Sequence, residues 1–180
     1  MRLLTRRQTT LGLGLALATA APARAAAGFR VVSMAFYQPA PVLEARLGPD
    51  VDPFVAYYGA LKAEAARVFA LQKPGPGVTG AIVMAVKPAY RSKAWLVLGD
   101  NRLAPDAQAA VTSALEKVRP MRVTGGPFAF AITFEVWGGG RNLAYGASYP
   151  LPVPDAWLEV LPTGGQVVMP DFPLSKVWPD

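Results

Sequence analysis

The 180-residue sequence contains no cysteine and no histidine. Without thiols it can form neither a disulfide framework nor a cysteine-based metal site. Without imidazole it lacks the base of Ser-His-Asp and Cys-His catalysis and the commonest ligand of transition metals. We therefore expect no resident metal and no cofactor, and an enzyme built from this chain would have to use carboxylates, serine, lysine or tyrosine.

Clustered positive charge is also scarce. The chain carries 18 basic and 12 acidic residues, a formal net charge of +6. Four of the arginines lie within the first 27 residues, which leaves 14 basic and 12 acidic residues, a net of +2, in the remainder. These basic residues are scattered, whereas tracking a phosphate backbone requires a basic patch or stripe. We expect no nucleic-acid partner.

The first 27 residues have the layout of a bacterial secretory signal peptide. A basic start at residues 2–7 precedes an apolar run at residues 11–21, and Ala25 and Ala27 provide small residues for cleavage. The apolar run is about half the roughly 20 residues that a membrane-spanning helix needs. We expect a mature protein that lies in the periplasm and does not span the membrane, with the signal cleaved near Ala25 or Ala27.

The arginine pair at residues 6–7 resembles a twin-arginine export signal. The weakly hydrophobic run that follows, with Gly12 and Gly14, and Arg24 near the cleavage site agree with this interpretation. An ordinary secretory signal that contains the pair by chance is the alternative.

The centre of the chain predicts two helices and three strands. Asp52 and Pro53 are suited to a helix start, and apolar residues recur at helical spacing up to Leu71. Short apolar runs at residues 80–86 and 94–98 predict a hairpin, a stripe of small apolar residues predicts a helix over 106–118, and alternation over 128–137 predicts a half-buried strand. We expect an α+β fold: a small antiparallel sheet of about three core strands packed against two helices. N- and C-terminal strands could extend this sheet.

Four segments follow from this pattern. Residues 1–27 are the signal peptide, residues 28–51 a lead-in strand and loop, residues 52–137 the α+β domain, and residues 138–180 a C-terminal extension. Within the extension, two strand-like runs separated by Gly164-Gly165 predict a second hairpin over 157–169.

The central segment resembles the C-terminal domain of the TonB energy-transducer family. The residues that carry the resemblance are the Gly-Asp-Asn-Arg-Leu turn (99–103), the helix that begins Pro-Asp-Ala-Gln-Ala-Ala (105–110), the Val-Arg-Pro element (118–120) and the closing Ile-Thr-Phe-Glu-Val (132–136). The resemblance covers residues 52–137. In that family the sheet edge beside the final strand captures a short extended segment of an outer-membrane receptor, so the resemblance implies a protein or peptide partner in the cell envelope.

Carried over by resemblance, peptide binding falls on the last strand as an edge strand. Its main-chain groups would provide affinity, and its outward side chains, chiefly Thr133 and Glu135, would tune selectivity. The alternative is that this edge is already covered by residues 29–37 or 157–169, both of which are strand-like. The candidate peptide-binding residues are Phe130, Ala131, Ile132, Thr133, Phe134, Glu135 and Val136.

Catalytic groups are harder to find. Three pairs of acids could serve general acid–base chemistry: Asp50 with Asp52, Asp100 with Asp106, and Glu135 with Glu159. Each pair has a plainer structural interpretation, because its members include a residue at a helix start, in a turn or on the exposed face of a strand. No serine lies in a Gly-x-Ser-x-Gly elbow. We expect a non-enzymatic protein with no catalytic residues, and a carboxylate-dependent hydrolase of wall or glycan substrates is an alternative.

A second alternative is a membrane-anchored TonB-type transport accessory. Such a transducer must reach across the periplasm, yet only about 25 residues separate the predicted signal peptide from the first central helix. At roughly 3.3–3.6 Å per residue, this linker is too short even when fully extended. We therefore favour a free periplasmic domain without force transduction.

Overall fold

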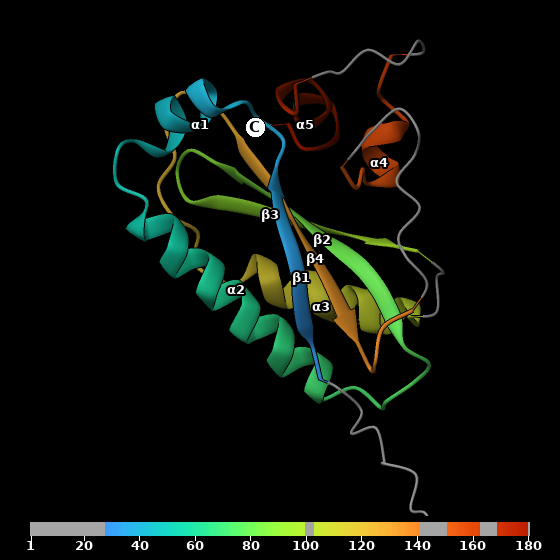
Figure 1. Cartoon of the computed structure of the whole chain (residues 1–180). Coiled ribbons are helices and arrows are strands. Elements are labelled where there is room, and N and C mark those ends of the chain that lie inside the picture. The colour runs from blue at the N-terminus through green and yellow to red at the C-terminus, as the bar shows by residue number, and fades with distance from the viewer. Residues whose placement is uncertain (1–27, 100–102, 141–150, 163–168, 180) are drawn as a thin grey trace, which may run out of the picture.

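The computed structural model describes residues 28–99, 103–140, 151–162 and 169–179, and it shows an α+β fold with one antiparallel sheet (Figure 1). The predicted fold class is confirmed. The predicted signal peptide lies outside the described residues. In chain order the elements are β1 (Arg30–Phe36), α1 (Ala40–Leu47), α2 (Asp52–Ala70), β2 (Val78–Lys87), β3 (Arg91–Leu98), α3 (Pro105–Glu116), β4 (Phe128–Val136), α4 (Asp155–Leu158) and α5 (Asp171–Val177).

The sheet has the strand order β1-β4-β2-β3. All ten residues of β2 are buried, and β4 is buried except at the half-buried Glu135. Both central strands are therefore covered on both faces, which explains why their sequences are near-continuous apolar runs. The hairpin between β2 and β3 is in register from Lys87 opposite Arg91 to Gly80 opposite Leu98, so β3 is a regular edge strand.

Helices α2 and α3 cover one face of the sheet (Figure 1). Their apolar stripes recur every three or four residues, which directs one side of each helix at the strands. The core they enclose is rich in rings: Phe54 meets Phe130 edge to face at 5.3 Å between ring centroids, and Phe69 lies 5.4 Å from Phe134. This layer is the larger of the two cores.

Helices α4 and α5 cover the opposite face. Trp157 and Leu174, which are 2% and 0% exposed, pack with the small buried residues Val83, Ala85 and Ala131. The alternation in β4 therefore does not mark a half-buried strand, and that expectation was wrong. Small side chains on the second face leave room for α4 and α5, which cover it.

The predicted hairpin over residues 157–169 is also corrected. Trp157 and Leu158 belong to the short helix α4, and residues 163–168 lie outside the described residues. None of the described helices is long and apolar enough to cross a membrane.

Candidate binding surfaces at the sheet edges

The last strand is not an edge strand. β4 pairs antiparallel with β2 from Val78 opposite Val136 to Val86 opposite Phe128, and on its other side with β1. The prediction that this strand offers an open edge is therefore wrong. The alternative that the N-terminal strand covers it is confirmed, because Ala35 lies opposite Ala131 and Phe36 opposite Phe130.

The seven candidate residues are consequently held within the sheet. Six of them are buried, including Thr133 at 8% exposure, and the side chain of Glu135 forms a 2.5 Å ion pair with Arg30. Neither of the two side chains expected to tune selectivity is presented to a partner. Their main-chain groups already serve the ladders with β1 and β2.

Aromatic side chains fix β1 against the helices at both of its ends. At the start, Phe29 stacks on Phe69 with 5.6 Å between ring centroids and lies 5.5 Å from Phe134. At the end, Phe36 lies 5.5 Å from Phe54. Displacing β1 would expose these rings to water, and each aromatic pair contributes about 0.5–1.5 kcal/mol beyond the buried area. β1 is thus an integral strand rather than a removable cover.

The outer edge of β1 is interrupted. Its register with β4 shifts between Val31 and Ser33, which places a bulge at Val32, and Val32 is 48% exposed. Bulges twist an edge away from regular pairing and are a common protection against strand addition. The β1 edge is therefore a poor template for an extended partner.

The outer edge of β3 is regular and partly capped. The N–H of Ala94 donates to the Glu116 carboxylate at 3.1 Å, so Ala94 faces away from β2. Because hydrogen-bonding direction alternates along an antiparallel strand, the main-chain groups of Leu96 and Leu98 face outward as well. The Glu116 carboxylate thus blocks the middle of the β3 edge, where it accepts a hydrogen bond as the main-chain carbonyl of an added strand would.

A groove lies beside this edge. It has a volume of about 290 Å³ and is open to solvent, with β3 as its floor, α3 as one wall and the start of α4 as the other. We call it the β3 groove; its lining residues are Ala94, Trp95, Leu96, Gln108, Ala109, Thr112, Pro154, Asp155 and Ala156. A helix flanking an exposed strand edge is the arrangement that admits an extended peptide as an added strand.

Sequence reasoning did not identify the β3 groove. One available sign was the pair of basic residues at the start of β3, Arg91 and Lys93, because charge is typical of edge strands. The far wall could not be found in the same way, because the pattern of residues 157–169 predicts a hairpin and gives no sign of the helix that begins at Asp155.

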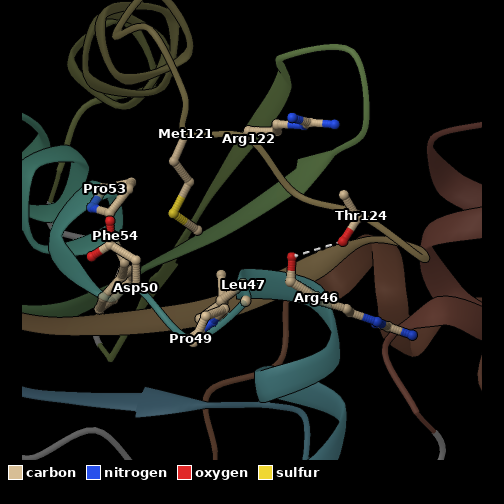
Figure 2. Close-up of a pocket in the computed structure, with 10 residues that line it drawn as sticks. Arg46, Leu47, Pro49, Asp50, Pro53, Phe54, Met121, Arg122 and Thr124 are labelled. Atoms are coloured by element: carbon tan, nitrogen blue, oxygen red, sulfur yellow. Dashed lines mark hydrogen bonds between the residues drawn. The ribbon is translucent and has the colours of Figure 1, made fainter.

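A second hollow, of about 410 Å³, lies between the α1–α2 connection and residues 121–124 (Figure 2). Figure 2 shows Phe54 and Met121 beside the hollow, while the guanidinium groups of Arg46 and Arg122 point away from it. Arg46 pairs with Asp171 of α5 at 2.6 Å instead. The arginine head groups therefore do not make an anion-binding pocket here.

A third cavity, of about 460 Å³, is lined in part by Lys87, Arg91 and Asp171. Both cations hold the C-terminal segment. The Lys87 ammonium lies 5.0 Å from the centre of the Trp178 ring, and the Arg91 guanidinium lies 5.2 Å from the same ring. These contacts give the two side chains a structural role, in addition to their place at the end of the hairpin.

Two of the candidate acids have structural partners. Asp50 accepts the Asp52 N–H at 2.9 Å, and Glu135 pairs with Arg30. Asp100 lies outside the described residues. Each of the three cavities above is lined by a single carboxylate, and no group of three acids among the described residues is placed to hold a metal ion.

Comparisons with known proteins add no relative. No protein-family model, curated protein or solved structure matches the chain.

Proposed function

We propose that this chain is an exported, non-enzymatic protein of the cell envelope that binds an extended segment of a peptide or protein partner by strand addition at the outer edge of β3. The observation that carries the proposal is the β3 groove, in which a regular strand edge lies between two helices. The proposal keeps the mode of binding that the resemblance to TonB C-terminal domains implies, and it moves the site from β4 to β3.

Main-chain hydrogen bonds provide the affinity in this mode. Each main-chain hydrogen bond between the partner and β3 contributes a net free energy of about 0.5–1.5 kcal/mol. The Glu116 carboxylate already occupies the Ala94 N–H, so the added strand pairs with the half of the edge that contains Leu96. Because only this part of the edge is open, few main-chain bonds form, and we expect weak, reversible binding.

The walls of the groove favour a strand over a compact ligand. Ala109 and Thr112 on α3 and Ala156 on α4 have short side chains, so a main chain can approach the floor between them. The floor of the groove also follows β3 over three consecutive residues. A chain that runs beside β3 extends the sheet by one strand without disturbing either core.

The test is a selection of random dodecapeptides displayed on phage against immobilised protein, residues 28–180. Enriched peptides are then synthesised and their binding is measured by fluorescence anisotropy. Ala109→Trp fills the groove from the α3 wall and is expected to weaken binding at least tenfold. Ala110→Trp is the matched control, since Ala110 is the neighbouring exposed alanine of α3 and does not line the groove.

Main-chain recognition is tested in the peptide itself. N-methylation of alternate peptide residues removes the N–H groups on one side of the strand only, so one methylation pattern is expected to abolish binding and the other to leave it intact. Equal effects of both patterns, equal effects of the two tryptophan variants, or a selection that yields no binder would each contradict strand addition at β3.

A further inference from the structure

We infer that the β3 groove selects a partner strand that presents a lysine or arginine side chain toward α4. This inference rests on the proposed function and adds the chemistry of the partner. Side chains of an added strand alternate between the two faces of the sheet, so every second residue of the partner faces the α4 wall. That wall and its floor combine an aromatic ring with a carboxylate.

The aromatic ring belongs to Trp95. It lies on the α4 face of β3 and lines the groove, and it meets Trp157 edge to face at 5.6 Å between ring centroids. Trp157 is 2% exposed and forms the centre of the smaller core. Trp95 is therefore held in position by a buried ring, and a tryptophan face is the best aromatic acceptor of a cation.

The carboxylate belongs to Asp155, the first residue of α4. It is exposed and lines the same groove. Among the residues that the structure describes, no lysine or arginine forms an ion pair with it. A cationic side chain that lies over Trp95 is thus offered a charge partner at the rim.

The opposite wall has a different character. Ala109 and Thr112 on α3 carry no charge, so the alternate residues of the partner meet a small neutral surface. Lys93 lies on the same face as Trp95, two residues earlier in β3, and repels a second cation at that end of the groove. The charges place a single basic residue at one position of the partner strand.

The test uses the dodecapeptides enriched in the phage selection. We expect lysine or arginine at one fixed position, and replacement of that residue by glutamine in the synthetic peptide is expected to weaken binding about five- to tenfold. Asp155→Asn should remove most of this preference, and Asp155→Lys should reverse it in favour of a glutamate-containing peptide. Asp106→Asn is the matched control, since Asp106 is also an exposed first-turn aspartate and does not line the groove.

The outcomes separate the two proposals. Peptides that bind in a manner abolished by Ala109→Trp, yet show no basic preference and no response to Asp155→Asn, would overturn this inference and leave strand addition standing. A selection that yields no binder would overturn both. A basic preference that persists unchanged in Asp155→Asn and responds instead to Asp106→Asn would place the charged contact elsewhere and also overturn the inference.

Discussion

Tyr57 should make the protein sensitive to alkaline pH. Its side chain is 3% exposed, it packs edge to face on Phe130 at 6.3 Å, and its hydroxyl has no hydrogen-bond partner among the described residues. Burial raises the pKa of Tyr57 to about 12 from its usual value of 10, because a phenolate loses its hydration there. The nearby Ser92 hydroxyl offsets part of this rise in the pKa of Tyr57. The Ser92 hydroxyl itself donates a hydrogen bond to the main-chain oxygen of Glu116 at 3.4 Å.

The sign and size of the effect follow from linkage. The folded state keeps the Tyr57 proton more tightly than the unfolded chain, so the stability is fully present below pH 10 and is lost as the pH rises toward 12. With pKa values of about 10 unfolded and about 12 folded, the loss is about 1.4 kcal/mol at pH 11. Tyr57→Phe removes this titration, and it also removes a buried hydroxyl that has no partner, so its own cost at pH 8 is expected to be below about 1 kcal/mol.

The assay is urea denaturation followed by circular dichroism at pH 8 and pH 11. Other groups also titrate in this range, so the relevant quantity is the difference between the two proteins: the wild type should lose about 1.4 kcal/mol more than Tyr57→Phe. Tyr90→Phe, at an exposed tyrosine, is the control and should behave as the wild type. Equal losses in the wild type and Tyr57→Phe would refute the argument that this hydroxyl is buried and neutral.

Three further substitutions test the fold. Phe29→Ala removes the ring that stacks on Phe69, so we expect a loss of about 2 kcal/mol and faster hydrogen exchange in β1, whereas exchange as slow as in the wild type would show that β1 is held by other means. Gly77→Ala places a Cβ atom 1.8 Å from the main-chain oxygen of Gly139 and should lower the free energy of unfolding by about 2 kcal/mol or more; an unchanged melting temperature would contradict this close approach. Gly59→Ala is the counterpart on the exposed face of α2, where nothing lies within 4 Å of the added Cβ atom. Alanine has the higher helix propensity, so this substitution should stabilise the protein by about 1 kcal/mol. A loss of stability would contradict an exposed helical position for Gly59.

The helices and the central strands could be predicted because their causes are local. Asp52 and Pro53 start α2 where expected, Pro105 opens α3, and the apolar runs of the hairpin extend by only a few residues beyond the predicted limits. Each of these features depends on spacing or backbone preference within a few residues. Such information is present in any short window of sequence.

The positions of the strand edges could not be predicted because they depend on contacts between distant residues. Nothing in the alternation of β4 indicates whether its neighbour is a partner protein or β1. Its small residues, such as Ala129 and Ala131, resemble a solvent-facing row until Trp157 and Leu174 are placed over them. The candidate site was wrong for this reason, and the β3 groove remained unnoticed because its two walls come from α3 and α4, about 40 residues apart in the chain.

The pairing of β1 with β4 has a consequence for biosynthesis. Arg30 and Glu135 are 105 residues apart, so β1 leaves the ribosome well before β4, the strand with which it pairs, has been translated. At about 5–20 residues per second, this delay lasts about 5–20 s. During that time the nascent N-terminal segment exposes its phenylalanines, and holdase chaperones that recognise such segments have their longest opportunity to act.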